Sequence, residues 1–280
     1  MSTRQVWMIT GAGRGLGRAL TLAALAEGHT VVATVRGEHT LPAHEQLHVR
    51  HLDVRDRAMA TAVVETAASE LGRLDVLVNN AGYGLIGAIE EVDENEARDL
   101  LDTDLLGPLW LSQAALPVMR RQGGGHIVQI STVGAAGTMP TLGLYNAAKW
   151  GLEGWSEAMA AEVAEFGVRT TIVEPGAIDT EWGAGSMHFA TPAPAYDNLR
   201  VRLFGTAEVP WPPSGTGGGT SSTAIAAAVL SHVADHSDRR LRLLVGEDAP
   251  GHVRAALDKR IEDYDLDPRW PSAATDEAGT

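Results

Sequence analysis

The chain has 280 residues, of which 44 % are hydrophobic and 21 % charged, a composition typical of a soluble globular protein. Its formal net charge of −14 argues against a nucleic-acid backbone or an anionic membrane as the main partner. There is no cysteine, which excludes disulfides and thiolate metal sites, and no apolar run approaches the roughly 18 residues of a membrane span. We therefore expect a cytoplasmic protein without a signal peptide.

The first 35 residues predict one compact unit. Residues 5–10 are typical of a strand, and a glycine-rich turn follows at residues 11–17. An apolar helical pattern then runs to about Gly28, and residues 30–35 are a second β-branched run. Strand, glycine turn, helix and strand in about 30 residues are the expected size of a βαβ crossover.

The alternation of strands and helices continues along the chain. Further strands are predicted at residues 47–54, 75–79, 126–131, 168–174 and 241–245. Helical patterns occupy residues 57–71, 94–121, 144–165, 223–235 and 251–263. This order predicts an α/β fold with a doubly wound, mostly parallel, seven-stranded Rossmann sheet and helices on both faces. Ligands of such sheets bind in the crevice at the carboxyl ends of the strands.

We expect one domain over residues 1–270, followed by a disordered tail at 271–280. Two stretches depart from the alternating pattern: residues 177–211 are rich in Pro, Trp, Met and Phe, and residues 214–223 are a Gly/Ser/Thr run. An apolar segment tied to the sheet by a flexible one predicts a substrate lid over residues 177–223. The alternative is a poorly ordered surface loop.

The glycine turn reads Thr10-Gly-x-x-x-Gly-x-Gly, with Leu16 where the common G-x-G-x-x-G pattern requires glycine. Glycines at 11, 15 and 17 allow a tight turn and close approach of the backbone to a pyrophosphate. The helix that begins there offers unpaired N–H groups and the positive end of its dipole. The turn therefore predicts a dinucleotide site; a purely structural glycine loop is the alternative.

The end of the second strand discriminates between dinucleotides. An NAD-binding protein usually places an acid there, whereas this chain has Arg36 and no acid until Glu38. Arg36 and Arg14 together are suited to clamp a ribose 2′-phosphate, so the sequence favours NADP(H) over NAD(H). The alternative is that either arginine is only a solvated surface charge.

Tyr145 and Lys149 are four residues apart on a predicted helix and therefore share a face. A phenol with a pKa of about 10 exchanges protons near neutrality only if a cation stabilises the phenolate. A lysine supplies that charge and also relays a proton, which an arginine does not. Chance also produces this spacing, so the pair gains weight only from its context.

Four motifs in order make the chain resemble the short-chain dehydrogenase/reductase family over residues 5–250. They are the turn at residues 10–17, Asn79-Asn80-Ala81-Gly82, Tyr145-x-x-x-Lys149, and Pro175-Gly176-Ala177-Ile178-Asp179-Thr180. The resemblance implies hydride transfer between a nicotinamide and a carbonyl or alcohol carbon, with Tyr145 as general acid or base. It implies that Lys149 binds the nicotinamide ribose and lowers the pKa of Tyr145. It also implies a homodimer or homotetramer built partly from the helices at 94–121 and 144–165.

The resemblance assigns two sets of residues. The catalytic set is Tyr145, Lys149, Thr132 and Asp104. The cofactor-binding set is Gly11, Arg14, Gly15, Leu16, Gly17, Arg36, Asp53, Val54, Asn80, Ala81, Gly82, Tyr145, Lys149, Pro175, Gly176, Ile178 and Thr180. Asp53 and Val54 are expected to flank the adenine, and the segment after Pro175 to meet the nicotinamide.

Two of these residues depart from the family pattern. Thr132 stands thirteen residues before Tyr145, where the family usually has serine, and Asp104 stands where it has asparagine. Ser131 does not simply replace the missing serine, because neighbouring strand residues face opposite sides. A threonine hydroxyl donates the same hydrogen bond, whereas an ionised aspartate only accepts. How well the proton relay works is therefore the open question.

The sequence predicts an NADP(H)-dependent oxidoreductase acting on a bulky, mostly apolar ketone or secondary alcohol. The size of the substrate is inferred from Trp182, Met187, Phe189, Tyr196 and Trp211, which alternatively only pack the lid onto the body. A non-catalytic NADP(H)-binding sensor or scaffold on the same fold is the second interpretation. The segment 44–48 spells H-E-x-x-H, but a strand pattern follows it, so we expect no metal site.

Overall fold

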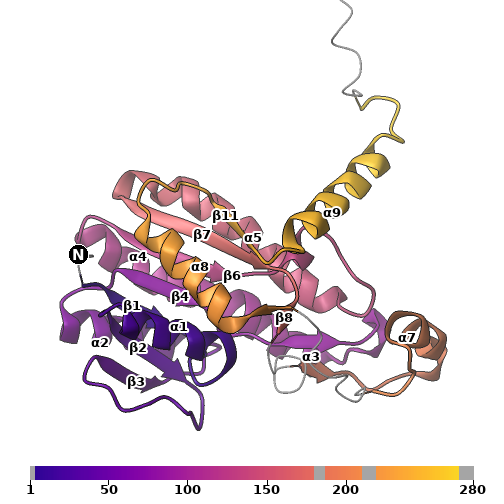
Figure 1. Cartoon of the computed structure of the whole chain (residues 1–280). Coiled ribbons are helices and arrows are strands. Elements are labelled where there is room, and N and C mark those ends of the chain that lie inside the picture. The colour runs from indigo at the N-terminus through magenta and orange to yellow at the C-terminus, as the bar shows by residue number, and fades with distance from the viewer. Residues whose placement is uncertain (1–3, 180–186, 210–218, 271–280) are drawn as a thin grey trace, which may run out of the picture.

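A computed structural model describes residues 4–179, 187–209 and 219–270. Its centre is a parallel sheet in the order β11-β7-β6-β4-β1-β2-β3 (Figure 1). The strands are β1 Val6–Ile9, β2 Thr30–Val35, β3 Leu47–His51, β4 Val76–Asn79, β6 Gly125–Ile130, β7 Val168–Pro175 and β11 Arg242–Val245. The chain order reverses between β1 and β4, which marks the switch point where such folds bind ligands.

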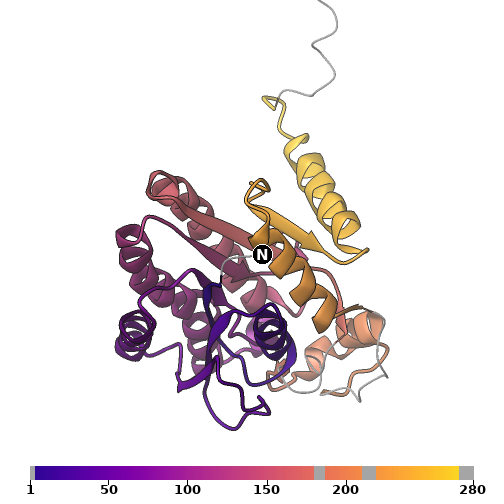
Figure 2. The same cartoon turned by 60° about the vertical axis from the view of Figure 1, so that its left-hand side comes forward.

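Helices cover both faces of this sheet (Figure 2). They are α1 Gly15–Ala26, α2 Arg57–Leu71, α3 Glu94–Leu101, α4 Gly107–Arg121, α5 Gly143–Val163, α7 Asp197–Phe204, α8 Ser222–Ala234 and α9 Ala249–Tyr264. One core lies between the sheet and α1 with α8, and the other between the sheet and α2, α4 and α5. The predicted doubly wound fold is confirmed.

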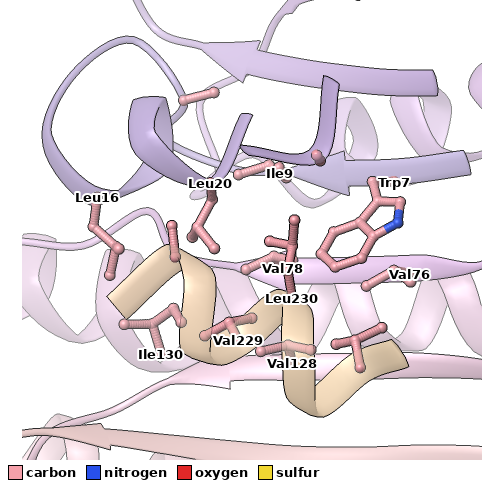
Figure 3. Close-up of a cluster of buried hydrophobic side chains, with 14 of the residues drawn as sticks. Trp7, Ile9, Leu16, Leu20, Val76, Val78, Val128, Ile130, Val229 and Leu230 are labelled. Atoms are coloured by element: carbon pink, nitrogen blue, oxygen red, sulfur yellow. The ribbon is translucent and has the colours of Figure 1, made fainter. Parts of the chain in front are cut away.

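The first of these cores shows why the strands read as continuous apolar runs. Trp7 and Ile9 of β1 lie beside Val78 of β4, and Leu20 of α1 and Leu230 of α8 close over them (Figure 3). A parallel sheet buried on both faces has no solvated side, so the residues that point to either face of the sheet are apolar. All four residues of β1 and all six of β2 are accordingly buried.

The prediction of one continuous α-helix over residues 94–121 is wrong. The structure divides it into α3, a π-helical segment at Asp102–Leu106, and α4. A wider π turn rotates the side chains that follow it, and such turns often lie at functional sites. Here it accompanies the burial of Thr103 and Asp104, and Gly107 packs closely on Val54.

Short elements that the sequence did not predict complete the structure. They are the strands β5 Gly84–Ile86, β8 Ile178–Asp179, β9 Met187–Phe189 and β10 Thr220–Ser221, and the 3₁₀ turns η1 Ile89–Glu91, η3 Val133–Ala135, η4 Ala164–Phe166 and η5 Pro194–Tyr196. Pairing of β5 with β9 joins the predicted lid to the segment after β4. None of the helices in the described ranges is both long and apolar enough to cross a lipid bilayer.

Candidate active site

The glycine turn has the geometry that a pyrophosphate requires. Gly11 and Gly15 have φ angles of +63° and +52°, which L side chains rarely adopt. A Cβ on Gly17 would collide with the backbone of Gly11, whereas the space beside Gly15 is open. Helix α1 has no side-chain cap and no acid in its first turn, so its terminal N–H groups remain available to an anion. The residues present therefore fit the phosphates of a dinucleotide.

Asn80 and Thr10 fix this turn against the end of β4. Thr10 Oγ1 accepts hydrogen bonds from the backbone N–H groups of Asn80 (2.9 Å) and Ala81 (3.0 Å). The Asn80 amide donates to the carbonyls of Thr10 (2.8 Å) and Gly11 (3.4 Å). The Asn80 side chain thus holds the glycine turn in place.

Tyr145 lies in the first turn of α5, buried to 8 % exposure, and shares a hydrogen bond with the side chain of Thr132. Thr132 follows directly after the carboxyl end of β6 in an extended conformation. Ser131 is directed elsewhere: its hydroxyl donates to Glu153 Oε1 at 2.6 Å. The expectation that the two neighbouring hydroxyls face opposite sides is confirmed, and only that of Thr132 lies beside the phenol.

Lys149 and Asp104 form a buried ion pair behind Tyr145. Lys149 Nζ lies 3.1 Å from Asp104 Oδ2, and the two side chains are 7 % and 0 % exposed. The ammonium also donates to the Ile130 carbonyl at 3.1 Å and lies 5.8 Å from the centre of the Tyr145 ring. Asp104 Oδ1 accepts the backbone N–H of Tyr83 at 3.1 Å. The four residues predicted as catalytic are therefore brought together.

The pKa of Tyr145 differs from the sequence expectation. In the protein alone, burial raises it above its ordinary value, the charge of Asp104 raises it further, and the hydrogen bond with Thr132 opposes both. Burial also raises the pKa of Asp104, against the influence of Lys149. The expectation of a lowered Tyr145 pKa omitted the desolvation of the phenol and the neutralising partner of Lys149.

Four of the expected cofactor residues, Arg14, Arg36, Asp53 and Val54, differ in how far their side chains are already engaged. Arg36 and Arg14 are exposed, and within the described residues neither guanidinium forms an ion pair. Asp53 is already engaged, because Arg55 binds both its carboxylate oxygens at 2.7–3.1 Å and lowers its pKa. The side chain of Val54 is buried against Gly107 in the core.

Several other residues predicted to bind the cofactor are glycines or pack into the core. Leu16 is buried in the core beneath the turn, and Gly82 lies so close to Asp104 that a Cβ there would be 2.7 Å from Oδ2. Gly176 packs on Asp248, whose Oδ2 accepts the Ala177 N–H at 2.9 Å. Pro175 ends β7 and Ile178 packs against the core, whereas Thr180 lies outside the described residues.

The H-E-x-x-H segment lacks the geometry of a zinc site. Residues 45 and 46 form a turn, and His48 belongs to β3, so no helix brings the two histidines to one face. Among the described residues no group of three or more His, Cys, Asp or Glu side chains is arranged to hold a metal ion.

A family model described as short chain dehydrogenase matches residues 5–188. The chain belongs to the short-chain dehydrogenase family. It is 36 % identical over 260 residues to Oxidoreductase BOA17 of Botryotinia fuckeliana, with 91 % of this chain and 93 % of that protein covered. It is 38 % identical over 178 residues to 3-ketodihydrosphingosine reductase of Bacteroides thetaiotaomicron, covering 63 % and 65 %.

A solved short-chain dehydrogenase from Streptomyces avermitilis superimposes on this dehydrogenase with a TM-score of 0.83. The two are 36 % identical, and the match covers 94 % of this chain and 96 % of that one. The chain is therefore an oxidoreductase, and its Rossmann sheet is a nucleotide-binding fold for a nicotinamide cofactor.

Two polar contacts of this dehydrogenase, one beside the site and one in the predicted lid, were missed in the sequence. Glu153 fixes Ser131 from α5, one turn beyond Lys149. Arg200 of α7 is 3 % exposed and forms a buried ion pair of 2.5 Å with Glu91 of η1. No local pattern predicts such a pair, because its two members are separated by 109 residues.

Proposed function

We propose that this chain catalyses the NADP(H)-dependent interconversion of a bulky, mostly apolar ketone and its secondary alcohol. The observation that carries the proposal is the group formed by Thr132 and the buried side chains of Tyr145, Lys149 and Asp104 at the carboxyl end of β6. Its polar atoms lie at the carboxyl edge of the sheet, where doubly wound folds bind their ligands.

Each side chain has a distinct task in this proposal. Tyr145 gives its proton to the carbonyl oxygen in reduction and removes the alcohol proton in oxidation. Thr132, which shares a hydrogen bond with the phenol, donates to the same substrate oxygen and orients it. Lys149, held by Asp104 and the Ile130 carbonyl, binds the ribose next to the nicotinamide. A bound nicotinamide supplies or accepts the hydride.

Tyr145 is protonated near neutral pH, because the ordinary pKa of a phenol is about 10 and burial raises it further. Reduction uses this protonated form, although the raised pKa makes it a weaker acid, whereas oxidation first requires its ionisation. We therefore propose reduction as the direction favoured near neutral pH, which agrees with the expected preference for NADP(H).

The decisive experiment is Tyr145→Phe, assayed by nicotinamide absorbance against a panel of carbonyl compounds and alcohols. The variant is expected to lose nearly all turnover and to bind NADPH as the native chain does. Tyr264→Phe, which removes an exposed hydroxyl far from the site, is the matched control. Turnover retained by Tyr145→Phe rejects the assignment. NADPH binding without turnover of any compound by the native chain favours the sensor or scaffold.

The proposed preference for NADP(H) rests on two arginines close to the glycine turn, neither of which forms an ion pair with another described residue. A Cβ on Gly13 would lie 3.5 Å from Val35 and from His39, so the segment that contains Arg36 passes directly beside the turn that contains Arg14. Each charge-assisted hydrogen bond to a 2′-phosphate is worth about 1.5–3 kcal/mol. Arg36→Asp is therefore expected to reverse the ratio of kcat/KM for NADPH and NADH. Arg121→Asp, an equal charge change at the far end of α4, should leave it unchanged.

We also propose that residues 177–223 form a substrate lid. Two kinds of contact hold its described part: β9 pairs with β5, and Glu91 accepts hydrogen bonds from Ala193 N–H and Arg200. Tyr196 serves to pack the lid, since its hydroxyl donates to Glu90 at 2.7 Å. Met187 and Phe189 are half-buried on β9, whereas Trp182 and Trp211 lie outside the described residues. The relative named 3-ketodihydrosphingosine reductase fits a bulky ketone as substrate.

A further inference from the structure

Helix α9 projects from the body of the molecule (Figures 1 and 2). One of its faces is apolar and exposed. Leu257, Ile261 and Tyr264 are 42 %, 48 % and 50 % exposed, and their spacing of four and three residues places them on one side of the helix. Trp270 extends this apolar stripe by stacking on Tyr264, with ring centres 4.8 Å apart. Half of the large exposed hydrophobic residues in the described ranges lie within 257–270.

A different side of α9 contacts the body. A Cβ on Gly137 would lie 2.6 Å from that of Ala256, and Arg260 donates to the Ala136 carbonyl at 3.0 Å. The Arg260 guanidinium also lies 4.9 Å from the centre of the Trp150 ring. These contacts fix α9 beside η3, the turn that follows Thr132, and leave the apolar stripe free for another partner.

The charges along α9 are divided between its two halves. Residues 251–260 contain three basic side chains and one acidic side chain, whereas residues 261–270 contain four acidic and one basic. A parallel pair of such helices would place like charges together. An antiparallel pair places the basic half of one helix against the acidic half of the other, so the segment is complementary to itself.

We infer that the apolar stripe of α9 binds a second copy of this chain, with the two helices antiparallel about a two-fold axis. Arg254 and Asp265 are eleven residues apart, and at 100° per residue their directions around the helix axis differ by only about 20°. Both therefore lie along the same side of the stripe. The midpoint between Arg254 and Asp265 nearly coincides with that between Leu257 and Ile261. One axis therefore pairs Leu257 with Ile261 of the second copy and Arg254 with Asp265 of the second copy.

Other occupants fit this stripe less well. The ten residues that follow it, Pro271 to Thr280, contain no Leu, Ile, Val, Met or aromatic side chain with which to cover it. An anionic membrane is disfavoured by the four acids of the second half. Arg254 is 79 % exposed, and its contact with Asp258 in its own chain is long, at 4.0 Å, so it is free to pair with a second copy. The interface does not involve the long helices that the family resemblance names.

The absence of cysteine allows a direct test by engineered disulfides. Leu257→Cys and Ile261→Cys chains are mixed and mildly oxidised, and the covalent heterodimer is measured by mass. The expected result is a heterodimer as the main product, while Ala255→Cys with Ile261→Cys, on different sides of the helix, gives little. Equal yields in the two mixtures, or no heterodimer from the first, overturn the inference.

A charge exchange then tests the orientation in chains without cysteine. Arg254→Asp and Asp265→Arg each place like charges together twice in the dimer, and each is expected to lower the association constant about tenfold. The double variant recreates both pairs and is expected to return to within about threefold of native. Sedimentation gives the constants, and unfolding temperatures show that every variant is folded. Failure of the double variant to recover overturns the antiparallel pairing, as does an association that neither single variant weakens.

Discussion

Replacing Asp104 with Asn removes a buried negative charge beside the proton relay and preserves the size of the side chain. In the native chain this carboxylate neutralises Lys149 at 3.1 Å and raises the pKa of Tyr145. In the variant the ammonium, which lies 5.8 Å from the centre of the Tyr145 ring, acts on the phenol without compensation. With an effective dielectric constant of about 20, a unit charge at that distance contributes about 3 kcal/mol, or about two pKa units.

Water that enters the site screens part of this interaction, so we expect Asp104→Asn to lower the pKa of Tyr145 by about one to two units. Ultraviolet titration of tyrosinate, taken as the difference between Asp104→Asn and Asp104→Asn/Tyr145→Phe, isolates this one phenol among the four tyrosines. The same shift should move the pH at which alcohol oxidation rises downward. The matched control is Asp102→Asn, which removes an equal charge two residues away. An unchanged or higher Tyr145 pKa refutes the reasoning, as does an equal shift in the control.

Three further predictions follow from particular contacts. Thr132→Ala should lower kcat about 10²- to 10³-fold because it removes the hydroxyl beside Tyr145, whereas Ser131→Ala should mainly cost about 1 kcal/mol of stability through its lost bond to Glu153; equal losses of kcat would contradict this. Burial, and then the charge of Glu153, raise the pKa of Glu174 from 4.5 to about 7, although Arg242 at 3.2 Å opposes this shift. Between these two pH values the folded state keeps a proton that the unfolded state releases, so the free energy of unfolding falls as the pH rises. In urea unfolding, the free energy of unfolding of Glu174→Gln relative to that of the native chain should therefore increase by up to about 3 kcal/mol as the pH rises from about 5 to about 8. A difference that does not change with pH would disprove the shift. Thr141 has a φ of +72° and a buried hydroxyl without a partner, so Thr141→Gly should raise the free energy of unfolding by about 1 kcal/mol, whereas Thr138→Gly, without positive φ, should lower it.

Much of the fold was predictable because it depends on local patterns. Buried parallel strands read as apolar runs, and the helix at Arg57–Leu71 was predicted to the residue from its helical pattern. In the structure Asp56 caps this helix and a left-handed Gly72 ends it. The π segment at Asp102–Leu106 was not predictable in this way. Its sequence continues an ordinary helical pattern, so no local signal marks the widening.

The sequence by itself determined the family, the order of strands and helices, and the identity of the four side chains at the relay. It also determined that Ser131 and Thr132 face opposite sides, because alternation along an extended chain is a local property. Only the tertiary structure decided the electrostatics of Tyr145. Desolvation depends on which distant segments bury a group, and Coulomb energy depends on the distance between two charged groups in the folded chain. Residue spacing alone therefore predicts neither the raised pKa of Tyr145 nor the pairing of Lys149 with Asp104.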